Sequence, residues 1–528
     1  MQLMNELEDL VGQKLMIGIR GTRVTPETVE IFRKTRAGGL ILFRPNFESA
    51  EGLKKLISGL EQALERKLLV AVDHEGGRVI HLAEGITVFP DNWCIGNTQN
   101  ADYARQQGEI EARELRQLGI DLNLAPTLDV LTENFSPNIG IRSYGKDPNL
   151  VARLGAARIQ AMQKGGLSAC AKHFPGQGHS PLDCHLDLPI LSATPGEMEK
   201  IHLLPFREAI RAGVDTIMTS HPIYPELDSE KQPATFSGKI VYGLLREKLG
   251  FLGVILSDDL EMGALKGICG IGEVAARAVS AGHDIVLLCH DPDAQVEVFE
   301  NLLNAYREKR LSLKELEESA ERIENLKKKR TERFLQNDGM SQGPSLPRQI
   351  AREGIRITKN SSVLPVSKYS RTCVIFPKLS ALNSRIFIEG KMLDENAFVR
   401  NLFEEQGIPL DSIQIVGLDP DDAEIQRALE DIQKSDLPVF FCYDTRLSAQ
   451  TKKLLGVVES LAKHRIIVLL RNPYDEQFIH EQTCVISAFG FRAVQMEAAV
   501  EAMTMSTHKS ATNHGGSNSS DTIRSGLI

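Results

Sequence analysis

The chain has 528 residues, of which 42% are hydrophobic and 25% charged, and its formal net charge is −9. This composition is typical of a globular protein with two or three domains, and it excludes a disordered or fibrous chain. Because basic residues are not in excess, nucleic acid is not an expected partner.

The start of the chain, MQLMNELEDL, carries acidic residues where a secretory signal would carry basic ones, and no apolar run approaches the length of a membrane span. Eight cysteines stand singly, without a CxxC pair, which is typical of reduced thiols. We therefore expect a cytoplasmic protein with no membrane partner. The oligomeric state stays open.

Residues 1–335 alternate short apolar runs with amphipathic segments, which predicts parallel strands that are each followed by a helix. The eight runs are LMIGI, GGLILF, LLVAVD, DLNLAP, SACAKH, DTIMTS, GVILSD and DIVLLC. Eight strands close a (β/α)8 TIM-type barrel, although an open doubly wound sheet would also alternate. Polar residues at the C-terminal ends of the runs favour the barrel, whose active sites lie there: Arg44, Asp73, Asp129, Lys172, His173, His221, Asp258 and His290.

The rest of the chain predicts a smaller second domain. Residues 336–347 are rich in turn formers and read as a linker. Residues 348–505 contain a helical segment and five strand runs, TCVIFP, SIQIVG, PVFFCYD, RIIVLLR and CVISAFG, which suit a small α/β sandwich. Residues 506–528 are polar and rich in Gly and Ser, so we expect a disordered tail.

The stretch KHFPGQGHSPLDCH, from Lys172 to His185, follows the fifth run and is too rich in Gly and Pro to be helical. In it, Asp183 and His185 stand two residues apart. A carboxylate at this spacing can bind one ring nitrogen, favour the imidazolium and leave the other nitrogen to transfer a proton. The triplet alone is equally typical of a structural turn.

Asp258, in VILSDDLEM, follows a buried run and is expected to point into the mouth of the barrel. A proton donor opposite a carboxylate nucleophile is the arrangement that cleaves a glycosidic bond with retention. Ordinary retaining enzymes use two carboxylates, and here His185 would replace one of them.

Four motifs also occur in a distinctive order: VAVDHEGGRV, IGIRSYGKDP, KHFPGQGHSPLDCH and FLGVILSDDLEMGA. They resemble glycoside hydrolase family 3, in its β-N-acetylglucosaminidase (NagZ-type) branch, and AREGIRITKNSSVLP resembles the start of the second domain of its two-domain members. The resemblance implies that Asp258 forms a covalent glycosyl-enzyme and that His185 is the acid/base, assisted by Asp183. The residues that it implies in substrate binding are Asp73, Arg142, Lys172 and His173, with His81 as a further candidate.

The resemblance therefore implies a retaining exo-β-N-acetylglucosaminidase that removes terminal GlcNAc from peptidoglycan-derived muropeptides, without a metal or an organic cofactor. Two residues depart from the family pattern, because Gln177 and Cys184 stand where a His and a Ser are usual. Neither change removes an acid, a base or a nucleophile, so we expect activity to survive.

Three alternatives remain open, one of which is a β-glucosidase of the same family, although those enzymes lack the Asp-His dyad. A β-N-acetylglucosaminide phosphorylase could use the same residues, because a neutral imidazole does not repel phosphate as a carboxylate would. A non-catalytic sugar-binding barrel would keep the fold without turnover. Metal binding is disfavoured because its candidate ligands match no helical spacing; they are His173, His179, Asp183 and His185.

Overall fold

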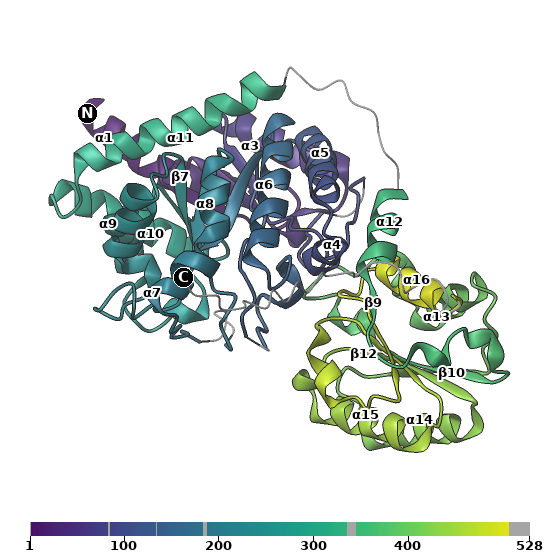
Figure 1. Cartoon of the computed structure of the whole chain (residues 1–528). Coiled ribbons are helices and arrows are strands. Elements are labelled where there is room, and N and C mark those ends of the chain that lie inside the picture. Colours follow the sequence, from purple (N-terminus) through teal and green to yellow (C-terminus); the bar gives the residue numbers. More distant parts are fainter. Residues whose placement is uncertain (1, 83–84, 134, 183–186, 335–344, 506–528) are drawn as a thin grey trace, which may run out of the picture.

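The computed structural model describes residues 2–82, 85–133, 135–182, 187–334 and 345–505. It has two units, a closed eight-stranded barrel and a smaller domain built on a six-stranded sheet. Figure 1 shows them beside each other, with the barrel in purple to teal and the second domain in green to yellow. The predicted fold class is confirmed.

The eight apolar runs form the eight parallel strands of the barrel, which closes because β1 pairs with both β2 and β8. The strands are β1 (Leu15–Gly18), β2 (Gly39–Leu42), β3 (Leu69–Val72), β4 (Leu122–Asn123), β5 (Ser168–Phe174), β6 (Thr216–Thr219), β7 (Val254–Asp259) and β8 (Ile285–Leu288).

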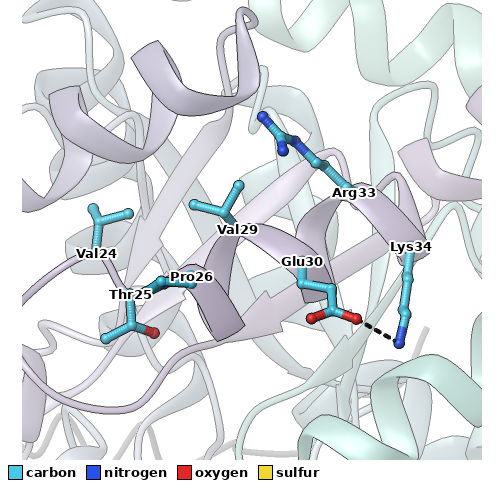
Figure 2. Close-up of a pocket in the computed structure, with 7 residues that line it drawn as sticks. All are labelled: Val24, Thr25, Pro26, Val29, Glu30, Arg33 and Lys34. Atoms are coloured by element: carbon cyan, nitrogen blue, oxygen red, sulfur yellow. Dashed lines mark ion pairs between the residues drawn. The ribbon is translucent and has the colours of Figure 1, made fainter.

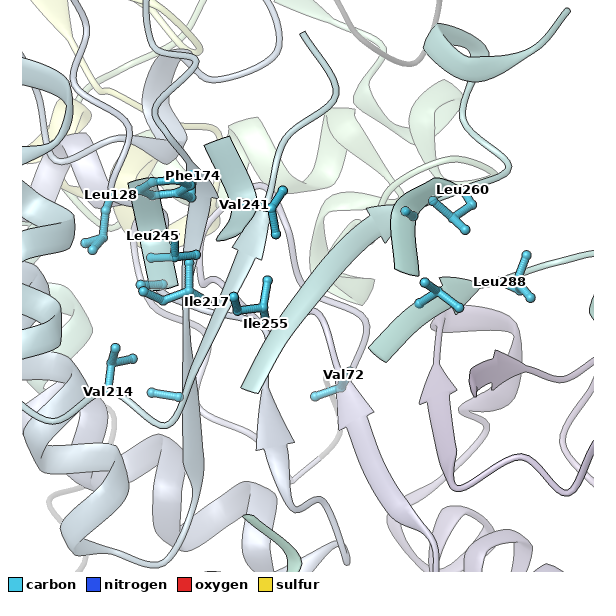
Figure 3. Packing of buried hydrophobic residues seen from close by; sticks show 14 of the residues in the cluster. Val72, Leu128, Phe174, Val214, Ile217, Val241, Leu245, Ile255, Leu260 and Leu288 are labelled. Atoms are coloured by element: carbon cyan, nitrogen blue, oxygen red, sulfur yellow. The ribbon is translucent and has the colours of Figure 1, made fainter. Parts of the chain in front are cut away.

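The strands are mostly apolar because both of their faces are buried, and several of their polar residues stand at the C-terminal ends. In β3, Leu69 and Ala71 belong to the core inside the barrel, whereas Val70 and Val72 pack outward against the helices. Figure 3 shows this outer core, in which strand residues meet helical residues such as Val241. Burial of each such aliphatic side chain contributes about 1.5–3 kcal/mol.

Helices surround the barrel, and several begin with a residue that caps them. Thr25, for example, accepts a hydrogen bond from Thr28 N at 3.1 Å, and Pro26 opens the helix that follows. The helices are α1 (Gln2–Gln13), α2 (Pro26–Thr35), α3 (Ala50–Leu64), α4 (Asn92–Thr98), α5 (Ala101–Gln117), α6 (Pro148–Lys164), α7 (Pro195–Glu197), α8 (Leu204–Arg211), α9 (Ile271–Ala281), α10 (Pro292–Arg307) and α11 (Leu313–Phe334), with a π-helical segment, η5 (Lys239–Lys248), before β7.

The second domain contains the five expected strands and a sixth short one, in the order β11-β10-β12-β13-β14-β9. Only β9 runs antiparallel to its neighbour. The strands are β9 (Arg356–Ile357), β10 (Thr372–Pro377), β11 (Ser412–Val416), β12 (Leu437–Cys442), β13 (Ile466–Leu469) and β14 (Cys484–Ser487). Helices cover both faces of this sheet (Figure 1): α12 (Ser345–Gly354), α13 (Glu395–Glu404) and α16 (Ala493–Ala502) on one, and α14 (Asp422–Lys434) and α15 (Ala449–Leu461) on the other.

Helix α12 begins at Ser345, inside the segment that we expected to be a linker, because Leu346 and Ile350 bury their side chains. The boundaries that we gave the two domains and the linker between them stay a prediction. Aromatic packing joins the two units, since Trp93 of the barrel lies with its ring centroid 5.5 Å from that of Phe489.

The seven cysteines in the described part of the chain are all free. Among the helices that the structure describes, none combines the length and the apolar character needed to cross a membrane.

Candidate active site

A cavity of about 260 Å³ opens at the C-terminal ends of the barrel strands, and one segment of the second domain also lines it. Of the eight site residues predicted from the sequence, six line this cavity: Asp73, His81, Arg142, Lys172, His173 and Asp258. The other two, Asp183 and His185, lie outside the described residues.

Strand periodicity explains why three of these side chains meet. Successive residues of a strand point to opposite faces, so residues two apart share a face. Asp73, Lys172 and Asp258 each follow by two positions a residue of the inner barrel core. Those inner residues are Ala71, Cys170 and Leu256. The barrel therefore directs the three charged side chains toward its mouth.

A buried ionic network lines the cavity. Lys172 Nζ contacts the Asp73 carboxylate and lies 2.6 Å from Glu75 Oε1. Arg142 donates from Nη2 to Glu75 Oε1 at 2.7 Å and from Nε to Glu75 Oε2 at 2.8 Å. Burial by itself raises the pKa of Glu75, but Arg142 and Lys172 outweigh it and hold this pKa well below its ordinary value. Glu75 is therefore ionised and offsets the charge of both cations.

Sequence reasoning assigned no role to Glu75, although it stands inside the motif VAVDHEGGRV. A signal was present, because Glu75 lies two residues beyond Asp73, the residue predicted to bind sugar. Both side chains contact Lys172 in the structure.

His173 is held by a second carboxylate. Its Nδ1 lies 2.7 Å from Asp129 Oδ2, so Nδ1 carries the proton that this carboxylate accepts. Its Nε2 lies 3.4 Å from Arg142 Nη2. The other oxygen of Asp129 accepts from Gln177 N at 2.7 Å. Asp129 thus fixes both the imidazole and the start of the loop that leads to residues 183–185.

Asp258 lies at the end of β7, where its Oδ1 accepts a hydrogen bond from Asp259 N at 2.9 Å. This hydrogen bond, donated by the backbone of the next residue, orients the Asp258 carboxylate. His81, also in the cavity, has a pKa that burial lowers, so it is neutral at neutral pH. The cavity thus offers a carboxylate at the end of a strand beside cations and the neutral imidazole of His81.

The second domain contributes a wall to the cavity, formed by Arg385, Ile386 and Phe387. Arg44 of the barrel secures this wall by contacting the carbonyl oxygen of Asn383 and by donating to that of Ile386 at 2.6 Å. No motif pointed to the wall, because its residues lie in a loop without apolar periodicity.

Three further polar residues that follow barrel strands do not line the cavity. Asp129 lies behind His173, and the His221 ring is bonded to Thr235 Oγ1 at 2.6 Å and to the carbonyl oxygen of Asp259 at 3.0 Å. His290 is exposed and stacks on Phe43. Standing after a strand is therefore not sufficient to reach the pocket.

The residues considered as metal ligands do not assemble in the part of the chain that the structure describes. His173 binds Asp129, whereas the His179 ring packs on that of His202, with centroids 4.2 Å apart. No group of three or more His, Cys, Asp and Glu side chains among the described residues is placed to hold a metal ion.

A second hollow lies on the outside of the barrel and is lined by α2 and the turn before it (Figure 2). Its carboxylate, Glu30, is paired with Lys34 at 2.9 Å. All of its lining comes from one short stretch, residues 24–34, so no distant groups converge there. We assign it no chemistry.

Comparisons with known proteins identify the family of the chain. Residues 6–326 match the glycosyl hydrolase family 3 N-terminal domain. The chain is 40% identical over 297 residues to a beta-hexosaminidase of Neisseria meningitidis serogroup C (strain 053442), a match that covers 54% of this chain and 81% of the relative.

Solved structures are similar over one or both domains. A glycoside hydrolase family 3 beta-N-acetylglucosaminidase from Paenibacillus sp. str. FPU-7 is 30% identical, with a TM-score of 0.87, covering 94% of this chain and 96% of that one. NagZ from Neisseria gonorrhoeae, in complex with N-trifluoroacetyl-D-glucosamine, is 34% identical with a TM-score of 0.50, covering 59% of this chain and 97% of that one.

Proposed function

The chain belongs to glycosyl hydrolase family 3, as its motifs predicted, and we propose that it is a retaining exo-β-N-acetylglucosaminidase. We propose peptidoglycan-derived muropeptides as its substrates and the cytoplasm as its location. The observation that carries the proposal is that Asp258 lines the same cavity as the side chains expected to bind the sugar. The names of the similar proteins support β-linked GlcNAc as the sugar that is removed.

In the first proposed step, Asp258 attacks the anomeric carbon while the imidazolium of His185 gives its proton to the glycosidic oxygen. The carbon–oxygen bond to the leaving group breaks, and a glycosyl-Asp258 ester forms. In the second step a water molecule attacks the anomeric carbon, neutral His185 takes its proton, and the ester bond breaks. An imidazole whose pKa lies near neutrality can serve both steps, and Asp183 would orient it.

The described residues have binding roles in this scheme. Asp73 and Lys172 present a carboxylate and an ammonium group to sugar hydroxyl groups, and Glu75 keeps the charge near Lys172 and Arg142 compensated. This compensation matters because the transition state carries positive charge at the sugar ring. His173, held by Asp129, adds a fixed imidazole beside Arg142.

Mass spectrometry tests the nucleophile. The intact protein is treated with a fluorinated GlcNAc-type inactivator and then digested, and we expect one glycosyl adduct on the peptide that contains Asp258. Asp258→Asn should form none, whereas the neighbouring Asp259→Asn should still be labelled. An adduct on another carboxylate, or labelling that persists in Asp258→Asn, would contradict the proposal.

Product analysis separates hydrolysis from its rivals. An aryl β-GlcNAc substrate should give free GlcNAc at the same rate with or without phosphate. GlcNAc 1-phosphate formed only with phosphate would identify a phosphorylase. Binding of GlcNAc without any turnover would identify a non-catalytic barrel.

A further inference from the structure

Among the residues that the structure describes, cationic side chains outnumber carboxylates around the cavity. The cations that line it are Arg44, Arg78, Arg142, Lys172 and Arg385, and the carboxylates are Asp73, Glu75 and Asp258. A positive excess disfavours the cationic transition state of glycoside cleavage. The excess becomes useful when the substrate itself brings an anion to the cavity.

Arg385 is the cation best placed to meet such an anion. Arg142 and Lys172 already face Glu75. Arg44 is engaged with the carbonyl oxygens of the second-domain wall, and Arg78 donates to the carbonyl oxygen of Pro137 at 3.4 Å. Arg385 is exposed, and its side chain makes no hydrogen bond or ion pair with any residue that the structure describes. Its guanidinium is therefore available for a ligand.

The backbone that carries Arg385 is fixed on both sides. Arg44 of the barrel holds Asn383, donating to its Oδ1 at 2.7 Å, and also binds Ile386. The buried Arg492 donates to the carbonyl oxygen of Phe387 at 2.8 Å and to that of Gly77, in the barrel, at 2.7 Å. Two arginines thus hold the backbone of the wall against the mouth of the barrel, so the exposed side chain of Arg385 extends from a fixed backbone.

We propose that Arg385 is a specificity residue that binds a carboxylate on the leaving part of the substrate. The proposal rests on the exo-hydrolase function above. In an exo-acting enzyme the terminal sugar fills the closed end of the pocket, so the leaving group extends to the open mouth, where exposed Arg385 stands. A guanidinium donates two parallel hydrogen bonds to a carboxylate, which gives both affinity and orientation.

The test uses two disaccharides that differ only in this group: GlcNAc-β-1,4-MurNAc, whose lactyl carboxylate is free as in a muropeptide that has lost its peptide, and its methyl amide, which imitates the peptide-linked form. Their Kd values are measured by calorimetry with the full chain carrying Asp258→Asn, so that binding is read without cleavage. We expect the acid to bind about tenfold more tightly than the amide, equivalent to about 1.4 kcal/mol. Adding Arg385→Gln should bring the ratio of the two Kd values close to one.

Two further variants control the result. Arg385→Lys keeps the charge but loses the two-pronged geometry, so it should restore part of the ratio. Arg427→Gln removes an exposed arginine from α14 of the same domain and should leave the ratio unchanged. A ratio close to one in the parent protein, or a ratio that Arg385→Gln does not alter, would overturn the proposal.

Two other outcomes are informative. Equal weakening of both disaccharides by Arg385→Gln would show that Arg385 shapes the wall rather than recognising the carboxylate, and would overturn the proposal. Formation of GlcNAc 1-phosphate that depends on Arg385, with a Kd ratio close to one, would assign Arg385 to inorganic phosphate instead. Failure of the native chain to hydrolyse aryl β-GlcNAc would count against the proposed function alone, because the Kd ratio is measured without turnover.

Discussion

Replacement of Glu75 by Gln tests whether the ionic network of the cavity depends on this one carboxylate. The side chains of Glu75, Lys172 and Arg142 are only 1%, 2% and 10% exposed. Glu75→Gln keeps the shape and one acceptor oxygen but leaves two buried cations with less compensation. Removal of one partner from a buried ion pair costs about 3–5 kcal/mol, and because Gln still accepts a hydrogen bond we expect the lower end of this range.

A loss of about 3 kcal/mol corresponds to a fall in Tm of about 4 °C for a barrel of this size, because the entropy of unfolding grows by about 2.1 cal/mol/K with each residue. Calorimetry of the full chain at pH 7 measures the shift. The same variant should lower kcat/KM for aryl β-GlcNAc by about 100-fold, because Lys172 and Arg142 lose the carboxylate that positions both of them.

The matched control is Glu30→Gln. Glu30 forms an ion pair with Lys34 at 2.9 Å, but both side chains are more than half exposed, so Tm should change by no more than about 1 °C. If Glu75→Gln shifts Tm as little as this control, the reasoning on the buried network is wrong.

The pH dependence of the effect has a definite sign. The pKa of Glu75 is lower in the folded protein than its ordinary value of 4.5. A carboxyl group whose pKa is lower in the folded protein than in the unfolded chain stabilises the fold at pH values above its unfolded pKa. This stabilisation is lost as the pH falls through the folded pKa. The difference in unfolding free energy between the native chain and Glu75→Gln should therefore be constant above pH 4.5 and narrow below it.

Two further predictions concern other parts of the barrel. Gly140 has φ +44°, and a Cβ added there would lie 2.1 Å from Asn472 Oδ1, whereas Gly21, with φ +74°, faces open space. Gly21→Ala should therefore lower the free energy of unfolding by only the backbone strain, about 1 kcal/mol, whereas Gly140→Ala should lower it by about 2 kcal/mol or more. Denaturant unfolding measures both values, and equal losses of unfolding free energy would show that the added Cβ does not clash with Asn472. Burial lowers the pKa of His179 to about 4 and that of His202 to about 3, so the unfolded chain binds more protons than the folded one as the pH falls below 6.5, and stability declines toward acid. His202→Phe keeps an aromatic ring stacked on His179 but removes the imidazole that takes up a proton in the unfolded chain. The Tm of this variant should therefore fall less between pH 6.5 and pH 4.5 than the Tm of the native chain, and an equal fall in both proteins would refute the prediction.

The part of the site that could be predicted from the sequence consists of side chains whose positions follow from the residues next to them in the chain. Asp73, Lys172 and Asp258 belong to apolar runs whose periodicity indicates strands, and in a closed parallel barrel every such run ends at the same rim. The placement of these three side chains in one cavity therefore followed from local pattern together with the number of strands. The roles of Asp183 and His185 stay predictions from the motif.

The remaining part depends on contacts between distant segments. Arg44 and Asn383 are 339 residues apart, and their hydrogen bonds form only when the surfaces of two complete domains meet. No periodicity in the loop around Arg385 signals that it faces the barrel. The sequence alone determined the barrel and the charged side chains at its rim, because strand periodicity is local. Only the tertiary structure decided that a second domain walls the pocket and adds an arginine to it, because domain packing depends on the shapes of whole surfaces.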